Sequence, residues 1–207
     1  VNALSSLCEA TGADIDEVSS VMGSDTRIGS KFLKAGPGFG GSCFKKDVLN
    51  LVYLCENHGL YPAAEYWEQV IKINNWQQER IVDRMVDAMF QTLSDKKIAI
   101  FGFAFKADTG DTRETPALNI VHRLRQEHAR IIVTDPQALE NAMKDLEGCG
   151  ESVSFEADPY RAVAGADAII VMTPWEEYRK LDWRRVKKAM RAPMLVFDTR
   201  NILDHDK

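Results

Sequence analysis

The sequence predicts an α + α/β protein, in which a helical domain precedes a doubly wound parallel sheet with helices on both faces. From residue 4 to residue 93 apolar side chains recur at helical spacing, with one glycine-rich interruption. Short apolar runs rich in isoleucine and valine follow after residue 96 and alternate with helical stretches. This alternation is typical of a parallel sheet covered by helices. We therefore assign residues 1–95 to a helical domain and residues 96–207 to a sheet domain.

The first two helices are marked by their start and stop residues. Apolar residues recur at helical spacing from Leu4, and Thr11-Gly12 ends that helix. Asp14, with Glu17 three residues later, forms a capping box that begins a second, short helix. We expect this second helix to end at Gly23, because glycine favours the conformation that terminates helices.

A glycine-rich stretch and a long helix follow. Residues 35–42 read Ala-Gly-Pro-Gly-Phe-Gly-Gly-Ser, which is incompatible with a regular element because glycine loses the most entropy on ordering and proline lacks a donor. A helix resumes at about Phe44. Residues 62–93 then form one amphipathic pattern without an internal glycine or proline, and Phe90 belongs to its apolar stripe. Such a helix is ~45 Å long, enough to link two domains.

The second half of the chain changes period. Apolar runs predict strands at residues 97–103, 130–135, 168–173 and 194–198, with a short fifth at 152–155. Helical stretches lie between them, at about residues 116–127, 136–146, 158–164 and 182–190. Thr115 and Pro116 open the first of these as N-cap and first helical residue.

Composition excludes several classes of protein. The net charge of -5 over 207 residues gives no reason to expect a nucleic-acid partner. No apolar run approaches the ~20 residues of a membrane helix, and no signal segment opens the chain, so we expect no membrane partner. The four cysteines are scattered without a C-x-x-C pair, which indicates neither a metal site nor a disulfide framework. A reducing cytoplasm is the expected setting.

The start of the chain also carries an expectation. Val1 is not a start methionine, and the helical pattern begins at once. We therefore expect a further segment upstream of Val1.

Cys43 is the candidate reactive residue. It follows the glycine-rich stretch and begins a helix, where free backbone N–H groups and the helix dipole favour a thiolate or stabilise an oxyanion. Lys45 and Lys46 add positive charge, and Asp47 adds a carboxylate that can orient a water or a lysine. The alternative is that Cys43 is a buried small hydrophobe, the usual state of a free cysteine. Cys8 and Cys55 lie in apolar helical patterns, where we expect burial.

Four blocks of sequence, in this order, resemble the UDP-glucose dehydrogenases of the UDP-glucose/GDP-mannose dehydrogenase family. The most informative is G-F-G-G-S-C-F-K-K-D-V at residues 38–48. It is preceded by D-T-R-I-G and F-L-K at residues 25–29 and 32–34. It is followed by G-F-A-F-K-A-D-T-G-D-T-R-E at residues 102–114 and F-D-T-R-N at residues 197–201. The resemblance covers essentially the whole chain, and four ordered blocks are far more specific than one.

The resemblance implies a four-electron oxidation. Enzymes of this kind oxidise C6 of UDP-glucose twice, with two molecules of NAD, to UDP-glucuronate. By resemblance, Cys43 attacks the C6 aldehyde to form a thiohemiacetal, which becomes a thioester that water hydrolyses. Asp47 then helps to position the water and a lysine; the alternative for Asp47 is a helix-stabilising carboxylate in the first turn.

The resemblance also implies binding residues. Those for UDP-glucose are Phe32, Leu33, Lys34, Gly38, Phe39, Gly40, Phe105, Lys106 and Arg200. Arg27 matches an arginine that reaches the neighbouring subunit's substrate site, which implies a homodimer or a higher homo-oligomer, with the long helix as its dimerisation helix. Residues beside NAD are Phe44, Lys45, Lys46 and Arg113. Without the motif, each basic residue would be read as a solvated surface residue.

The sheet domain departs from a dinucleotide-binding pattern. Residues 102–107 follow the first strand without an intact G-x-G-x-x-G, which fits a Rossmann-like domain that binds the UDP part of the substrate, not NAD. The family's NAD-binding domain is absent from this chain. We therefore expect weak UDP binding and little NAD-dependent activity from the chain alone.

Two alternatives stay open. One is a sister dehydrogenase that acts on GDP-mannose or a UDP-N-acetylhexosamine. The other is a non-catalytic, dimerising fragment that binds a nucleotide sugar.

Overall fold

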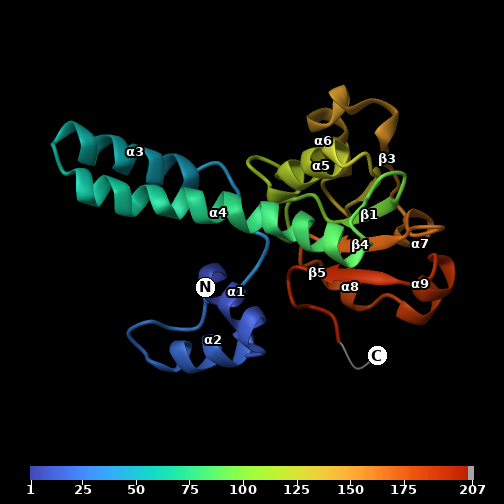
Figure 1. Ribbon diagram of the computed structural model, residues 1–207, viewed down its shortest axis with the longest axis horizontal. Helices are drawn as coiled ribbons and strands as arrows, with labels where there is room; N and C mark the ends of the chain where they lie inside the picture. Colours follow the sequence, from blue (N-terminus) through green and yellow to red (C-terminus); the bar gives the residue numbers. More distant parts are fainter. Residues whose placement is uncertain (205–207) are drawn as a thin grey trace.

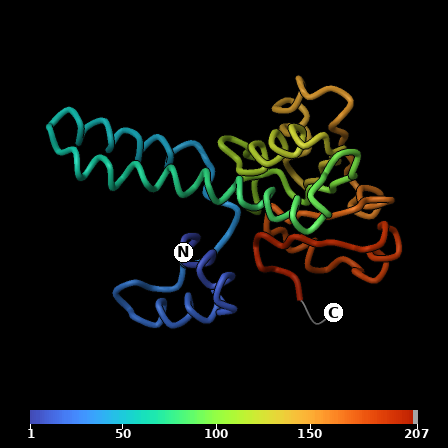
Figure 2. The backbone as a smooth tube through the Cα atoms, viewed as in Figure 1, coloured from blue at the N-terminus to red at the C-terminus, as the bar shows by residue number. Residues whose placement is uncertain are grey.

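The computed structural model describes residues 1–204, and its first half is helical. The helices are α1 (Asn2–Thr11), α2 (Ile15–Ser24), α3 (Phe44–Asn57) and α4 (Tyr61–Ala88). In Figure 1, α3 and α4 form a hairpin that points away from the sheet, while α1 and α2 form a separate pair near the middle of α4. Figure 2 shows the chain running from α2 through a long extended stretch to the start of α3, beside the sheet domain.

The second half is a parallel sheet, as predicted. Its strands are β1 (Lys97–Phe101), β2 (Arg130–Thr134), β3 (Val153–Phe155), β4 (Ala168–Val171) and β5 (Leu195–Asp198). They pair in the order β3-β2-β1-β4-β5, and every pair is parallel. The intervening helices are α5 (Pro116–Gln126), α6 (Leu139–Asp145), η1 (Glu147–Ser152), α7 (Pro159–Ala162), α8 (Glu176–Arg179) and α9 (Trp183–Ala189). The short elements α8 and η1 were not predicted, because so few residues display no period.

Each face of the sheet packs against its own hydrophobic cluster, which confirms the doubly wound arrangement. The first cluster combines one sheet face with α5 and with residues of α4 such as Val82 and Met85. The second combines the other face with Trp175, Tyr178 and Val186. The carboxyl-terminal part of α4 therefore belongs to the core of the sheet domain, while its amino-terminal part pairs with α3. One helix joins the two halves through buried packing.

Two predicted helix ends are wrong. The helix α4 ends at Ala88, five residues early, because Phe90 and Gln91 take left-handed φ angles of 63° and 62°. Phe90, predicted on the apolar stripe, is 81% exposed as a result. The helix α2 continues to Ser24 and contains Gly23, where an added Cβ would lie 2.9 Å from the Cα of Ser30. Glycine is needed there for close packing of the following loop.

The strand order places a crevice where ligands bind in open α/β sheets. The central strand β1 has β2 as its neighbour on one side and β4 on the other, so the direction of the strand order reverses between β1 and β4. The carboxyl ends of β1 and β4 therefore form a topological switch point. Residues 102–114 and 199–201 follow strands at this edge. Within residues 1–204, no helix has the length and apolar character to span a membrane.

Candidate active site

Cys43 is exposed, which excludes the buried-hydrophobe alternative for this residue. It forms the N-cap of α3, and the N–H of Asp47 donates to its carbonyl at 2.9 Å. Its Sγ lies 3.5 Å from Oγ of Ser42. Cys8 and Cys55 are buried, as expected. The sequence thus correctly located Cys43 at the start of a helix, and the fold leaves its sulfur open to reaction.

The helix α4 holds one side of the glycine-rich loop that precedes Cys43. Oδ1 of Asn74 accepts from the N–H of Phe39 at 2.8 Å, and Nδ2 of Asn74 donates to the Phe39 carbonyl at 3.2 Å. Nε2 of Gln77 donates to the carbonyl of Gly36 at 2.8 Å. The loop is not part of a helix or a strand, so its backbone groups take these side chains of α4 as hydrogen-bond partners.

The sheet domain holds the other side of the loop. The N–H of Gly41 donates to the carbonyl of Arg113 at 2.9 Å. A Cβ on Gly40 would lie 2.5 Å from the carbonyl oxygen of Glu114 and 3.1 Å from Cβ of Phe105, so only glycine fits. Nζ of Lys45 pairs with Glu114 at 2.8 Å. This glycine-rich loop of residues 35–42, which we call the Cys43 loop, therefore lies between α4 and the segment that follows β1.

Arg200 lies against the loop from the far strand of the sheet. Its Nε donates to the carbonyl of Met172 at 2.6 Å, and its Nη2 donates to that of Phe105 at 3.4 Å. A Cβ on Gly36 would lie 2.9 Å from Nη1 of Arg200. Burial lowers the pKa of Arg200 to about 10, while the nearby carboxylate of Asp198 acts in the opposite direction. The guanidinium stays protonated at neutral pH.

A second charged group lies beside Cys43. Arg113 donates through its guanidinium to Asp111, with a closest distance of 2.6 Å. This hydrogen bond raises the pKa of Arg113 and lowers the pKa of Asp111. The negative charge of a Cys43 thiolate also raises the pKa of Arg113, as a smaller contribution. Arg113 is thus close enough to Cys43 to feel its charge.

Phe105, Lys106 and Phe44 complete the surroundings. The ring of Phe39 packs edge-on against that of Phe44, with centroids 4.6 Å apart. Nζ of Lys106 lies 5.5 Å from the ring centroid of Phe105, within range of a cation–π contact. Lys106 is exposed at the switch-point edge. An exposed thiol, three aromatic rings and several cations therefore gather in one region.

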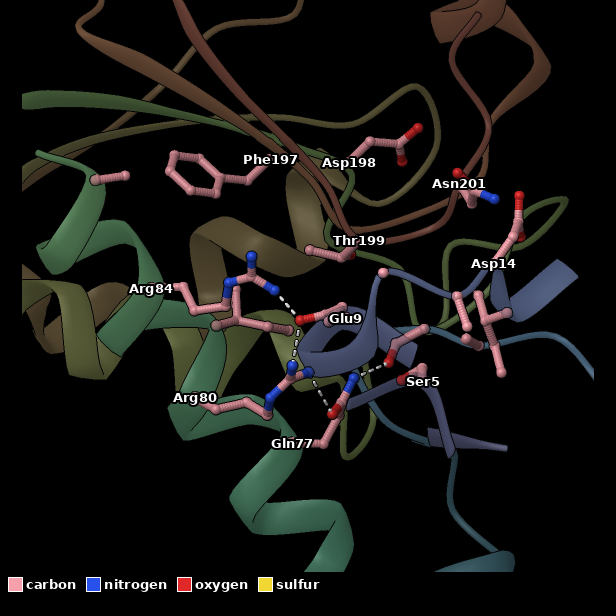
Figure 3. Close-up of a pocket in the computed structure, with 17 residues that line it drawn as sticks. Ser5, Glu9, Asp14, Gln77, Arg80, Arg84, Phe197, Asp198, Thr199 and Asn201 are labelled. Atoms are coloured by element: carbon pink, nitrogen blue, oxygen red, sulfur yellow. Dashed lines mark hydrogen bonds and ion pairs between the residues drawn. The ribbon is translucent and has the colours of Figure 1, made fainter. Parts of the chain in front are cut away.

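A separate cleft of about 550 Å³ lies between α1, α4 and the end of β5 (Figure 3). Arg80 and Arg84 both point to Glu9, which forms an ion pair with each. Ala35 and Gly36 form part of its wall. The cleft is lined by the far side of the loop and does not include Cys43. Within residues 1–204, no group of three or more His, Cys, Asp or Glu side chains is arranged to hold a metal ion.

Comparison with known proteins identifies the family. The model for the central domain of the UDP-glucose/GDP-mannose dehydrogenase family matches residues 1–76, and the model for its UDP-binding domain matches residues 99–205. The chain belongs to the UDP-glucose/GDP-mannose dehydrogenase family. It is 48% identical to UDP-glucose 6-dehydrogenase 1 of Arabidopsis thaliana and 50% identical to UDP-glucose 6-dehydrogenase of Caenorhabditis elegans. Each alignment covers 99% of this chain, but only 46% and 44% of those relatives.

Solved structures agree with this family assignment. A UDP-glucose dehydrogenase from Pyrobaculum islandicum superposes with a TM-score of 0.80 at 28% identity. It covers 96% of this chain, which in turn covers 46% of that structure. A UDP-D-ManNAc dehydrogenase from Pyrococcus horikoshii superposes at 0.77 with 23% identity, over 99% of this chain and 44% of that one, and shows the shared fold.

Enzymes of this family use NAD, and the first turn of the sheet domain does not fit that cofactor. In dinucleotide-binding domains the turn after the first strand offers free N–H groups to the pyrophosphate, and an acidic residue after the second strand binds the ribose. Here that acidic residue is Asp135, which is buried and turned inward. It accepts hydrogen bonds from the backbone N–H groups of Phe103, Ala104, Gln137 and Ala138 and from the indole N–H of Trp175. The N–H groups of the turn after β1 are therefore already bonded to the carboxylate of Asp135, which follows β2.

Replacing Asp135 by asparagine is expected to lower the free energy of unfolding by about 3 kcal/mol, because the amide turns an –NH₂ group toward buried N–H donors. Urea denaturation measures the effect. Asp182→Asn is the matched control: Asp182 caps α9 through one oxygen, which asparagine retains, so its cost is near zero. Equal, small losses in both variants would contradict the structural role assigned to Asp135.

The remaining predicted site residues are not joined to the Cys43 loop by a hydrogen bond or ion pair within the described chain. Phe32 is 97% exposed, and Lys34 and Lys46 are also exposed, while Leu33 is partly buried. Arg27 pairs with Asp25 at 2.5 Å and points into solvent. Their roles therefore stay predictions.

Sequence reasoning missed the residues that hold the loop. These are Asn74 and Gln77 of α4, which hydrogen-bond to the loop backbone, Gln78, which lies beside Gly38, and Glu114, which pairs with Lys45. Asp135, which holds the turn after β1 and not the Cys43 loop, was also missed. A signal was present for the amides, because they interrupt the apolar stripe of α4 at positions i, i+3 and i+4. Polar residues on a buried stripe require partners.

Proposed function

We propose that this chain is the nucleophile-bearing and substrate-binding part of an enzyme that oxidises UDP-glucose to UDP-glucuronate with NAD. The observation that carries the proposal is the exposed thiol of Cys43 at the start of α3, beside the switch point of a sheet domain that matches the UDP-binding domain of the family. The identity of 47–50% to several UDP-glucose 6-dehydrogenases supports UDP-glucose as the substrate. We place the boundary between the two domains near residue 95 and the protein in the cytoplasm.

In this proposal Cys43 holds the reacting carbon between the two oxidations. NAD, when bound, supplies the hydride acceptor. The Cys43 sulfur adds to the C6 aldehyde to form a thiohemiacetal and later carries C6 as a thioester. Water, positioned by Asp47, then cleaves the carbon–sulfur bond, which releases the carboxylate and returns the thiol. Asp47 lies one turn after Cys43 in α3, on the same side of the helix.

The remaining residues bind substrate and cofactor. We assign UDP-glucose to Phe32, Leu33, Lys34, Gly38, Phe39, Gly40, Phe105, Lys106 and Arg200. The cations of Lys106 and Arg200 suit a diphosphate. Phe44, Lys45, Lys46 and Arg113 would face NAD that is held mainly outside this chain. The exposed positions of Lys46 and Arg113 support that role.

A homodimer, or a higher homo-oligomer, fits the exposed surface of the helical hairpin. Large apolar side chains on α3 and α4 face solvent, among them Leu49, Tyr53, Tyr66 and Trp67. Exposed apolar patches of this kind mark interaction surfaces. In this proposal Arg27 reaches the partner's substrate site.

Two measurements on this chain test the proposed substrate. We expect UDP-glucose to raise the melting temperature and to slow the alkylation of Cys43 by iodoacetamide, because the ligand covers the thiol. GDP-mannose and a UDP-N-acetylhexosamine, tested at the same concentration, should do neither. Protection by GDP-mannose alone would favour the sister enzyme. A melting shift without thiol protection would favour a non-catalytic nucleotide-sugar-binding fragment.

Lys106→Gln is expected to weaken UDP binding about tenfold, because one charge-assisted contact to phosphate is lost. Isothermal titration calorimetry with UDP measures the change. The control is Lys187→Gln, since Lys187 is also exposed but lies on α9. An affinity that is unchanged in Lys106→Gln, or reduced equally in both variants, would argue against a diphosphate contact at Lys106.

A further inference from the structure

Three buried amides interrupt the apolar stripe of α4. Asn74, Gln77 and Gln78 are 6%, 5% and 5% exposed, and they lie on one face of the helix. An amide buried without a partner costs free energy that a hydrophobic residue would not. Core positions of a long helix are normally apolar, so a run of three amides requires a specific reason.

Asn74 pairs with both backbone groups of a single loop residue. It accepts from the N–H of Phe39 at 2.8 Å and donates to the Phe39 carbonyl at 3.2 Å. A neighbouring antiparallel β-strand bonds to both the N–H and the carbonyl of a residue in the same way. The loop of residues 35–42 contains four glycines, whose ordering carries a large entropy cost. The two hydrogen bonds therefore act where the backbone most needs restraint, four residues before Cys43.

The other two amides extend the contact in both directions. Gln77 donates to the carbonyl of Gly36 at 2.8 Å. Oε1 of Gln78 accepts from Nδ2 of Asn119 on α5 at 2.7 Å, which joins α4 to the sheet domain. A Cβ on Gly38 would lie 2.8 Å from Oδ1 of Asn74 and 3.1 Å from Nε2 of Gln78. The absence of a side chain at Gly38 is what lets the amides approach the loop.

We propose that Asn74, Gln77 and Gln78 are positioning residues. Asn74 and Gln77 hold the Cys43 loop by its backbone, and Gln78 fixes α4 against the sheet domain through Asn119. The proposal deepens the proposed function and rests on it, since the loop matters for catalysis only if Cys43 is the nucleophile. The amides contact loop backbone and Asn119, and they act on the reaction through the loop. The amides bind backbone groups of the loop, so the side chain of Phe39 stays available to the sugar nucleotide.

The test compares Asn74→Ala with Asn75→Ala in this chain. Asn75 is the same residue type, one position along the same helix, but exposed. We expect Asn74→Ala to speed amide hydrogen exchange of residues 36–42 at least tenfold. The UDP-glucose concentration that half-protects Cys43 from iodoacetamide should rise at least tenfold. Asn75→Ala should match the wild type in both measurements.

A second variant separates positioning from general destabilisation. Gln77→Ala removes only the hydrogen bond to the Gly36 carbonyl and leaves both Asn74 bonds in place, so we expect smaller increases of the same sign in exchange and in the half-protecting UDP-glucose concentration. If Asn74→Ala does not melt cooperatively, Gln77→Ala serves as the test variant.

The outcomes also separate this proposal from the proposed function. If UDP-glucose fails to protect Cys43 in the wild type, the proposed function is wrong, while exchange of residues 36–42 still measures the clamp. Exchange that is unchanged in Asn74→Ala, or increased equally by Asn75→Ala, overturns the clamp. Faster exchange with unchanged UDP-glucose protection overturns its positioning role.

Discussion

Replacing Cys43 by serine is expected to lower kcat of the complete enzyme by roughly 10⁴-fold or more, with the NAD-binding part in place. A serine hydroxyl is a far weaker nucleophile than a thiol at neutral pH, and it cannot form the thioester that links the two oxidations. The fold offers no substitute, because the other cysteines of the described residues are buried. Steady-state production of NADH from UDP-glucose measures the loss.

Cys55→Ala is the matched control for this variant. Cys55 lies on the same helix as Cys43 but is buried in its packed face. Its replacement is expected to lower the melting temperature while leaving kcat of the folded protein unchanged. A Cys43→Ser enzyme with kcat within tenfold of the wild type would remove Cys43 from the mechanism. Retained UDP-glucose binding in that variant would show that the substrate site itself is intact.

Replacing Gly102 by alanine is expected to lower the free energy of unfolding by about 4 kcal/mol or more. Gly102 has φ of 95°, and a Cβ there would lie 2.4 Å from Cβ and 2.7 Å from the backbone nitrogen of Thr173. Thr173 is fully buried, and its Oγ1 donates to the carbonyl of Ala104 at 2.6 Å, so it cannot move aside. Thermal unfolding should show a melting temperature roughly 10 °C lower.

Substitutions at two further glycines distinguish backbone strain at a positive φ from steric overlap of the added Cβ as the cause of the lost stability. Gly165 has φ of 66° but open space around its Cβ position, so Gly165→Ala is expected to cost only about 1 kcal/mol. Gly148 has neither a positive φ nor a close neighbour, and Gly148→Ala is expected to be near neutral. If Gly102→Ala is as stable as Gly165→Ala, the turn after β1 can shift to accommodate the added Cβ. That result would contradict the tight packing that we assign to the switch point.

Regular elements were predictable wherever the signal is local and repeated. The apolar runs of β1 and β4 indicated buried strands, and Thr115 was correctly placed as the N-cap of α5, where it accepts from the N–H of Ala117. The end of α4 was not predictable, because the left-handed turn at Phe90 breaks a pattern that continues in the sequence. A helix of four residues, such as α8, is too short for a helical repeat of apolar residues to be recognised in the sequence.

The candidate site divides in the same way. Motif resemblance located Cys43, Phe105 and Arg200, and the structure brings their segments together at one edge of the sheet. Asn74 lies on the core-facing stripe of α4, but the helical period of the sequence does not indicate its partner. The contact depends on a loop 35 residues earlier in the chain.

The sequence by itself determined the order of the two halves, the parallel sheet, the family and the place of Cys43 at the start of a helix. Helical and strand periods, caps and glycine-rich turns act over a few residues, so they can be recognised without coordinates. Only the tertiary structure decided that Cys43 is exposed, that Asp135 closes the first turn of the sheet domain, and that the Cys43 loop lies between α4 and that domain. These features depend on hydrogen bonds between residues such as Lys45 and Glu114, 69 positions apart, whose meeting is decided by how whole elements pack.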